Sequence, residues 1–212
     1  LYGVYTFLEK FLDCRMYSTK VKVVPKRDVI AFESINLKEI PVIKFRDVHY
    51  RVTYHDEFSE WHKLDHDARG GRPAWGSWVH TFNRLVPPDV YYKDHPEYFA
   101  LRDGKRLPTQ LCLSNPDVLK ITIQNLRKQI ASNPEAKYWS VSQNDNKQYC
   151  MCDKCRAIDE KEGSPSGSII TFVNKVADEF PNHMISTLAY EYGRKAPLTV
   201  RPRKNINIML CS

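Results

Sequence analysis

Two stretches of this sequence, Tyr138-Trp-Ser-Val-Ser-Gln-Asn-Asp-Asn146 and Met184-Ile-Ser-Thr-Leu-Ala-Tyr-Glu-Tyr192, decide the predicted fold. Each opens with a short apolar run that is typical of a buried strand, and each ends in polar and aromatic residues. Amphipathic stretches typical of helices separate such runs along the chain. Because strands that alternate with helices pair in parallel, we expect the two polar ends to lie at the same edge of one sheet.

Four further stretches have a strand-like character, and they cover residues 42–54, 75–80, 109–113 and 206–210. The best-marked helix follows the stretch Ser114-Asn-Pro-Asp117, which supplies a capping side chain, a proline for the first turn and an acid that suits the helix dipole. A second helix is expected over residues 168–180. The dipeptide Asp103-Gly104 predicts the turn of a β-hairpin.

This alternation predicts an α/β fold, namely a (β/α)8 TIM-like barrel that is incomplete in this chain. A complete barrel needs about 250 residues, whereas the chain has 212. Residues 1–40 combine a helical stripe with two short strand-like runs and look like the C-terminal part of a small α+β domain. We therefore expect about six strand–helix units of the barrel in residues 41–212. A doubly wound open sheet is the rival architecture, but no Gly-rich phosphate loop follows any predicted strand.

Composition excludes two classes of protein. The formal net charge is +7, yet Lys and Arg alternate with acidic residues, which is typical of a solvated surface and not of a nucleic-acid groove. No nucleic-acid recognition motif is found. No apolar run approaches the roughly 18 residues that a membrane helix needs. The chain opens at Leu1 inside an amphipathic pattern, so we expect further residues upstream.

Two strand-end motifs contain candidate catalytic carboxylates, Asp145 and Glu191. A glycosidase needs one carboxyl group to protonate the leaving oxygen and a second group to stabilise the positive anomeric carbon. Where the sugar bears a 2-acetamido group, the acetamide can act as the nucleophile, and Asn144 beside Asp145 could orient it. Both motifs also have a structural interpretation, because Asn and Asp favour turns and Glu191 could pair with Arg194.

Aromatic and amide side chains near the strand ends would suit a carbohydrate-binding cleft. Tyr190 and Tyr192 flank Glu191, where their rings could exclude water and stack on sugars. A third group follows the strand-like stretch 75–80 and consists of Trp78, His80 and Asn83. Core packing of the tryptophan and a hydrogen-bonded structural histidine would also explain this group.

Three of the six cysteines crowd into Cys150-Met-Cys-Asp-Lys-Cys155. Three thiolates at this spacing can bind Zn²⁺ if a fourth ligand is present. Cys152 and Cys155 also fit the spacing of a redox motif, and a disulfide with one spare thiol is the third interpretation. Cys112 and Cys211 each end an apolar run, so we expect them to be small core residues. The cysteine cluster follows the preceding polar turn closely and could brace it.

Six segments together resemble one bacterial family, and they cover residues 95–101, 110–116, 139–146, 150–155, 167–175 and 187–192. The sequence resembles glycoside hydrolase family 163 and its uncharacterised-domain relatives in glycan-foraging gut bacteria. Residues 1–15 look like the end of the small α+β domain that precedes the barrel in hexosaminidase and α-glucuronidase relatives.

The resemblance implies a TIM-barrel endo-β-N-acetylglucosaminidase that cleaves complex N-glycans with retention, requires no cofactor and is exported to the periplasm or cell surface. Its partner would be an oligosaccharide or a glycoprotein glycan. On the matching motifs, the resemblance implies that Asp145 and Glu191 are the catalytic carboxylates and that Asn144 orients the acetamide. Two other function classes fit the same residues: a non-catalytic glycan-binding barrel and a metal-braced interaction module.

Overall fold

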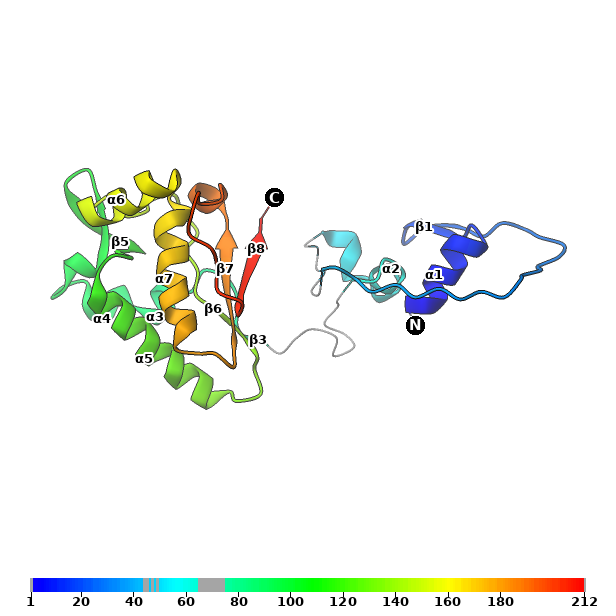
Figure 1. Ribbon diagram of the computed structural model, residues 1–212, viewed down its shortest axis with the longest axis horizontal. Helices are drawn as coiled ribbons and strands as arrows, with labels where there is room; N and C mark the ends of the chain where they lie inside the picture. The colour runs from blue at the N-terminus through cyan, green and yellow to red at the C-terminus, as the bar shows by residue number, and fades with distance from the viewer. Residues whose placement is uncertain (1, 44–45, 47, 49, 65–74, 212) are drawn as a thin grey trace. The chain divides into compact units, whose positions relative to one another are not determined.

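The computed structural model describes residues 2–43, 46, 48, 50–64 and 75–211, which belong to two compact units, Leu1–Pro73 and Ala74–Ser212 (Figure 1). The expected domain boundary after residue 40 falls inside the first of these units. No helix in the described ranges is both long and apolar enough to cross a membrane.

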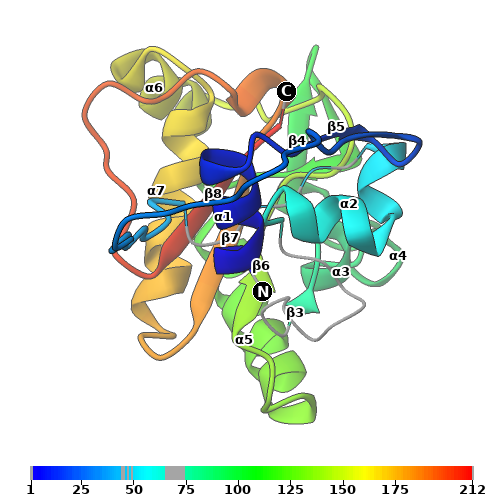
Figure 2. The same cartoon turned by 90° about the vertical axis from the view of Figure 1, so that its right-hand side faces the viewer.

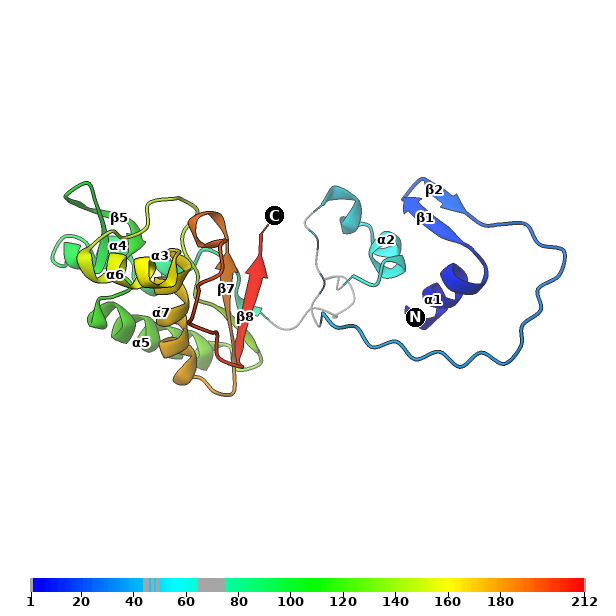
Figure 3. The same ribbon diagram turned by 45° about the horizontal axis from the view of Figure 1, so that its top comes forward.

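The first unit is a small α+β assembly. Its elements are α1 (Tyr2–Phe11), β1 (Arg15–Ser18), β2 (Val21–Val23), η1 (Arg51–Tyr54) and α2 (Asp56–Trp61). Strands β1 and β2 pair antiparallel (Figure 3). The small core of this unit contains buried Cys14, Met16 and Trp61, and the ring of Tyr5 lies 5.1 Å from that of Trp61.

The strand predicted over residues 42–54 is wrong where the structure describes this stretch. Residues 51–54 form the 3-10 helix η1, and Val42 is 97% exposed. An apolar run becomes a strand only when a sheet offers it hydrogen bonds and a face to pack on, and this run has neither among the described residues. Residues 44, 45, 47 and 49 of the predicted strand lie outside the described part of the chain.

The second unit has the α/β fold. Its elements are β3 (Trp75–Ser77), α3 (Phe82–Leu85), α4 (Pro88–Tyr91), η3 (Pro96–Tyr98), β4 (Phe99–Arg102), β5 (Lys105–Leu111), α5 (Pro116–Ser132), β6 (Tyr138–Ser140), α6 (Asp153–Glu162), α7 (Ser166–Asp178), β7 (Met184–Ala189), η4 (Glu191–Gly193) and β8 (Ile206–Leu210).

Four parallel strands form the central sheet, in the order β3-β6-β7-β8 (Figure 2). This confirms the mixed α/β class and the parallel pairing that the strand–helix alternation predicted. The described residues hold four parallel strands and seven α-helices, and their sheet is open, with β3 and β8 at its edges. A closed TIM barrel is therefore not shown by this structure.

One predicted barrel strand takes a different place. Residues 109–111 belong to β5, which pairs antiparallel with β4 in a separate two-stranded hairpin. Asp103 and Gly104 at the turn both have positive φ, 49° and 74°, as the tight hairpin turn between right-twisted strands requires. The local Asp-Gly turn thus pairs β5 with its immediate neighbour and keeps it out of the parallel sheet.

Helices α5 and α7 lie against one face of the sheet (Figure 1, Figure 3). Trp139 of β6 and Ile185 of β7 are register partners, and both pack into the core with Phe172 and Val173 of α7. Helix α5 begins as predicted, because the side chain of Asn115 accepts hydrogen bonds from two N–H groups of the first turn. The alternate side chains of the strands, including Ser140 and Ser186, point to the other face.

Candidate functional site

The residues that follow β6 and β7 meet at the carboxyl ends of these neighbouring parallel strands. Residues 145–149 contact residues 190–192 through three successive contacts, which we call the strand-end pairs. The Tyr190 hydroxyl donates to Asp145 Oδ1 (2.7 Å), Lys147 Nζ lies 3.1 Å from Glu191 Oε2, and the rings of Tyr149 and Tyr192 stack with centroids 4.8 Å apart. The structure thus brings both predicted catalytic carboxylates into one patch.

Asp145 is exposed, and Tyr190 holds one oxygen of its carboxylate. The hydrogen bond to Asp145 is the main reason why the pKa of Tyr190 is raised to about 12. Tyr190 therefore stays a protonated donor throughout the physiological pH range. Asp145 keeps a fixed orientation while remaining open to solvent.

Glu191 has a strained backbone and a salt bridge. Its φ is 47°, in the left-handed region that a residue with a long side chain rarely adopts. Its carboxylate pairs with Lys147 and not with Arg194, and its side chain is 32% exposed, compared with 76% for Lys147. Strained non-glycine residues cluster at functional sites, because surrounding contacts must hold them in place.

His80 shares this left-handed strain, with a φ of 57°, and lies against Tyr190. The two rings are 5.5 Å apart and nearly edge to face. His80 Nδ1 lies 2.8 Å from the carbonyl oxygen of Gln143. A carbonyl can only accept, so Nδ1 carries a proton, and Nε2 can accept a hydrogen bond from a ligand when the ring is neutral.

Asn144 and Asn83 hold the turn that presents Asp145. Asn144 is buried, and its Nδ2 donates to Asn83 Oδ1 (2.7 Å) and to the carbonyl oxygen of Thr109 (2.9 Å). Its Oδ1 accepts from the N–H of Asn83 (3.2 Å). Both N–H bonds of the Asn144 amide are therefore used inside the protein. Its role toward an acetamide stays a prediction, and in this conformation only the remaining lone pair of Oδ1 could serve it.

Gln110 is a buried positioning residue that the sequence analysis missed. Its Nε2 donates to the carbonyl oxygens of Asn144 (2.8 Å) and Asn146 (3.1 Å), and its Oε1 accepts from the N–H of Asn144 (3.0 Å). These bonds fasten the polar turn after β6 to β5. The signal in the sequence was a large amide inside the apolar end of a strand, since a buried amide needs partners.

The described ring contact of Trp78 is with Trp75, which is not part of this hydrogen-bond network. Its ring packs edge to face on Trp75 at 4.5 Å, and Trp75 in turn contacts Tyr138 at the start of β6. Tyr192 packs partly on the main core behind its stacked partner. The substrate-binding roles predicted for Trp78 and Tyr192 stay predictions.

Four cysteine sulfurs gather where the hairpin β4–β5 meets the start of α6. The Sγ atoms of Cys112, Cys150, Cys152 and Cys155 all lie within 4.8 Å of one another, and together they could bind a metal ion. Cys112 Sγ is 3.6 Å from Cys152 Sγ and 4.0 Å from Cys155 Sγ, far longer than the roughly 2.05 Å of a disulfide. All four are free thiols in this structure.

Cys112 corrects the expectation that it is merely a small core residue. The hairpin delivers it to the other three cysteines, because β5 ends at Leu111, just before it. Its sequence spacing of 40 residues from Cys152 follows no local ligand pattern, so only the fold could reveal it.

A comparison with known protein families finds one family that covers nearly the whole chain. The family described as Domain of unknown function (DUF4838) matches residues 16–212. The chain belongs to this family. No curated protein and no solved structure matches the sequence. The family description states no activity, so any function must be argued from the site.

In this DUF4838 chain, the close contact of the sulfurs lowers the pKa of Cys112 and raises the pKa of Cys150 and of Cys155. Hydrogen bonds from Cys150 and Cys155 lower the pKa of Cys112, whereas donation to Cys112 raises the pKa of Cys150 to about 12. The backbone N–H of Leu101 donates to Cys150 Sγ at 3.3 Å. Cys152 is the N-cap residue of α6.

Arg106 supplies positive charge to the same cluster. Burial alone would lower the pKa of its guanidinium, but interaction with Cys112, Cys150 and Cys152 raises it on balance. The guanidinium is fixed by donating to the carbonyl oxygen of Phe99 at 2.8 Å. A fixed cation next to several sulfurs partly offsets the charge of a thiolate cluster.

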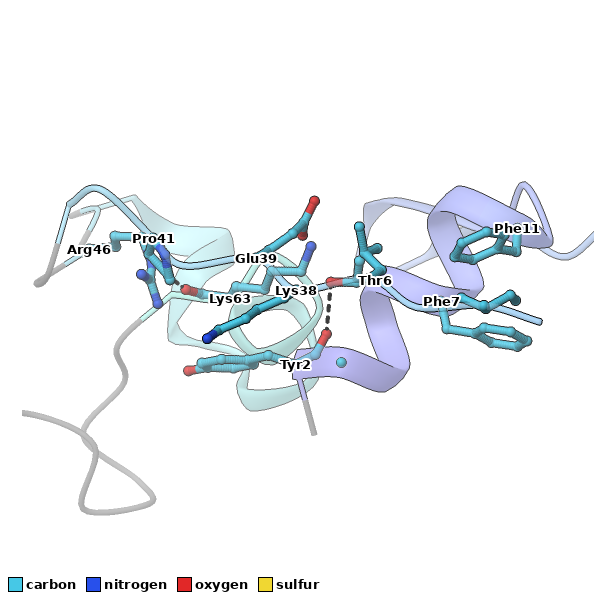
Figure 4. A pocket seen from close by; sticks show the side chains of 12 residues that line it. Tyr2, Thr6, Phe7, Phe11, Lys38, Glu39, Pro41, Arg46 and Lys63 are labelled. Atoms are coloured by element: carbon cyan, nitrogen blue, oxygen red, sulfur yellow. Dashed lines mark hydrogen bonds between the residues drawn. The ribbon is translucent and has the colours of Figure 1, made fainter.

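The first unit of the DUF4838 chain has a hollow of its own, with a volume of about 530 Å³ (Figure 4). It is lined by apolar and charged side chains, among them Tyr2, Phe7, Phe11, Lys38 and Glu39. None of the predicted site residues lines it. We therefore place the candidate site in the second unit, at the strand-end pairs.

Proposed function

We propose that this chain is part of a glycoside hydrolase related to family 163, with the complete protein forming a (β/α)8 barrel. The observation that carries the proposal is the meeting of Asp145, Tyr190 and Glu191 at the carboxyl ends of adjacent parallel strands. Active sites of barrels and of open α/β sheets are built at this edge. The substrate would be a complex N-glycan or a related host glycan, cleaved by an endo-β-N-acetylglucosaminidase type of reaction.

Asp145 and Glu191 would share the acid–base work. One carboxyl group would protonate the glycosidic oxygen as the bond breaks, and the other would stabilise the positive charge that develops on the sugar. With a 2-acetamido sugar, the acetamide oxygen would attack the anomeric carbon and give retention. Lys147 is largely exposed, so it could leave Glu191 when a sugar enters the patch.

His80 and Tyr190 would contribute to sugar binding next to these carboxylates. His80 Nε2 could accept from a sugar hydroxyl, because Nδ1 already donates to the chain. The faces of the half-buried rings of Tyr190 and His80 offer apolar surface beside the carboxylates. Asn83 and Asn144 would act mainly by holding the turn.

A glycan substrate of this kind occurs outside the cell, so the proposal includes export to the periplasm or cell surface. The first test uses the full-length protein with a glycoprotein that bears complex N-glycans. We expect mass spectrometry to detect released oligosaccharides that have been cut within the chitobiose core. Glycan binding without any release would instead support the non-catalytic glycan-binding alternative.

The proposal also includes a structural zinc ion at the four cysteines. Four thiolates around tetrahedral zinc, at Zn–S distances of about 2.3 Å, would place their sulfurs about 3.8 Å apart. The separations of 3.6 Å and 4.0 Å from Cys112 Sγ are close to this value. Four protein ligands leave no open position, which is typical of a structural site and not of a catalytic one. A bound ion would also keep these close thiols from forming disulfides in an oxidising compartment.

Zinc content is directly measurable. We expect about one zinc ion per chain in the purified protein by elemental mass spectrometry, as a four-thiolate site predicts. Cys112→Ser should lose the ion, whereas the matched control Cys211→Ser should retain it, because Cys211 is outside the cluster. Retention of zinc by Cys112→Ser would exclude the four-thiolate site.

A further inference from the structure

The segment from Asn144 to Cys155 leaves the sheet after β6 and enters α6 without forming a regular element until residue 153. It contains the three side chains that make the strand-end pairs with residues 190–192. A segment of this kind has no ladder of backbone hydrogen bonds to fix it. Its position must come from the contacts at its ends.

Both ends are attached to β5 or to Cys112, the residue that directly follows it. At the first end, Gln110 binds the backbone of Asn144 and Asn146, and the carbonyl oxygen of Thr109 accepts from Asn146 Nδ2 (3.0 Å). At the second end, Cys112 joins the cysteine cluster. Residues two apart on an extended chain point to the same side, so Gln110 and Cys112 face the segment together.

The other strand of the hairpin adds two contacts. Leu101 of β4 donates its N–H to Cys150 Sγ and accepts from the N–H of Met151 at 2.9 Å. The guanidinium of Arg102 lies 5.2 Å from the centre of the Tyr149 ring, whose stacked partner is Tyr192. The hairpin is therefore the platform on which the whole segment rests.

The hairpin itself is well fixed, because Phe99 of β4 and Leu111 of β5 are buried in the core of the second unit. The weaker link is the attachment of the second end of the segment to this hairpin. The second end of the segment is held to it mainly by sulfur contacts of 3.6 Å and longer to Cys112 and by the two bonds of Leu101. Hydrogen bonds between thiols are weak, whereas metal–thiolate bonds can supply the folding energy of an entire small domain.

We infer that metal bound at the four-cysteine cluster anchors residues 144–149 to the hairpin and so positions Asp145 against Tyr190 and Lys147 against Glu191. The inference rests on the proposed zinc ion and on the proposed site. It adds that the zinc ion keeps the residues of the site in position. The cysteines are positioning residues here, since none of them contacts the strand-end pairs directly among the described contacts. Cys150 also lines a surface hollow of about 300 Å³ beside the cluster.

Hydrogen exchange of the full-length protein, followed by mass spectrometry, tests the inference without relying on activity. The relevant amides are Asn146, Met151 and Gly193, whose N–H groups donate to backbone carbonyls in and around the segment. We expect chelation of the zinc to speed exchange in peptides covering 144–151 and 190–193 by at least about tenfold, as local opening does. Peptides from the core helix α7 should not change, and added Zn²⁺ should restore protection.

Each other result overturns the inference. Zinc that is removed without a change at 144–151 and 190–193 would show that the hairpin contacts suffice. Equal acceleration in α7 would show that the metal supports the whole unit and does not position this segment. Protein that binds no zinc would remove the anchor altogether. Cys112→Ser should show the same fast hydrogen exchange as the chelated protein, and the control Cys211→Ser should exchange like the native protein. If Cys112→Ser does not fold, the chelation experiment alone decides.

The measurement separates this inference from the proposed hydrolase activity. If the native protein releases no oligosaccharide, the hydrolase proposal fails. The exchange experiment still tests the anchoring, because it does not measure activity. If the protein is active and exchange at the two segments is independent of zinc, only the anchoring fails.

Discussion

At the scale of single residues, the proposed chemistry depends on Asp145 and Glu191, and the other members of the strand-end pairs hold these carboxylates in place. Asp145→Asn and Glu191→Gln keep the shape of each side chain but remove its charge and its ability to transfer a proton. Because general acid–base catalysis typically contributes about 10²- to 10⁴-fold, we expect each change to slow glycan release by that order while glycan affinity is retained. Initial rates by mass spectrometry and binding by calorimetry would measure the two effects.

The control for these variants is Glu97→Gln, an exposed carboxylate of the same unit that contacts His95. It should leave the rate unchanged. If Asp145→Asn and Glu191→Gln release glycan at close to the native rate, the two groups are structural. In that case the catalytic groups lie elsewhere in the protein.

Glu162 is a buried carboxylate that supports the loop between β7 and β8. It is 4% exposed and accepts from the Thr199 hydroxyl and from the N–H groups of Thr199 and Val200. These bonds, led by that of the hydroxyl, lower its pKa from 4.5 to about 2. A carboxylate with a depressed pKa stabilises the fold above its unfolded pKa, and this contribution is lost as the pH falls from about 4.5 toward 2.

We therefore expect the thermal midpoint of the native protein to fall over this pH window. Glu162→Gln should be less stable than the native protein at pH 7, and the difference should shrink as the pH approaches 2. Calorimetry at several pH values checks this. A difference that is constant with pH would mean that the Glu162 charge contributes nothing to stability.

At the scale of elements, local signals in the sequence predict more than long-range ones. The stretches 184–189 and 206–210 are strands, and α5 begins at its predicted cap, because periodicity and capping depend on neighbouring residues. The Asp-Gly turn was also visible. The sequence did not show that β5 would pair with β4 and not join the parallel sheet, because that choice depends on which other strands are available to pair with β5.

The same limit applies to the candidate site. The two strand ends with Asp145 and Glu191 follow from parallel alternation, so their meeting could be expected. Gln110 and Cys112 belong to a strand that approaches the site from outside the sheet. No spacing in the sequence relates them to the residues they hold, and only the tertiary fold brings them together.

Helix α5 offers a test of how much a local signal contributes. Asn115 caps it through Oδ1, which accepts from the N–H groups of Asp117 (2.8 Å) and Val118 (3.4 Å). Replacing such a cap with alanine typically costs about 1 kcal/mol, so we expect Asn115→Ala to lower the free energy of unfolding by about that amount. Denaturant titration measures it. Lys128→Ala, exposed in the C-terminal half of the helix, is the control and should change stability by less than about 0.5 kcal/mol.

At the scale of the whole molecule, the second unit combines an open parallel sheet with a hairpin that stands outside it. The cysteine cluster joins the hairpin to α6, which lies at the end of the sheet toward which β7 and β8 point (Figure 1). A catalytic site needs side chains held on rigid elements, and here a segment without regular structure bears one carboxylate. The proposed metal at the four cysteines would hold this segment in place.

Two interpretations of the cysteines, as metal ligands and as a disulfide, predict different responses of thermal stability. A ligand that binds only the folded state stabilises it by RT ln(1 + [L]/Kd), which is about 2.7 kcal/mol when the free ligand is 100 times Kd. We therefore expect the thermal midpoint of chelated protein to rise progressively with added Zn²⁺. Reductant should have no effect on the zinc-loaded protein, since zinc thiolates contain no disulfide to reduce. A midpoint that falls with reductant and does not change with chelator would instead identify a disulfide.

Cys112→Ser should abolish the response of the thermal midpoint to zinc, because three thiolates and a hydroxyl make a much poorer site. The control Cys211→Ser should keep this response.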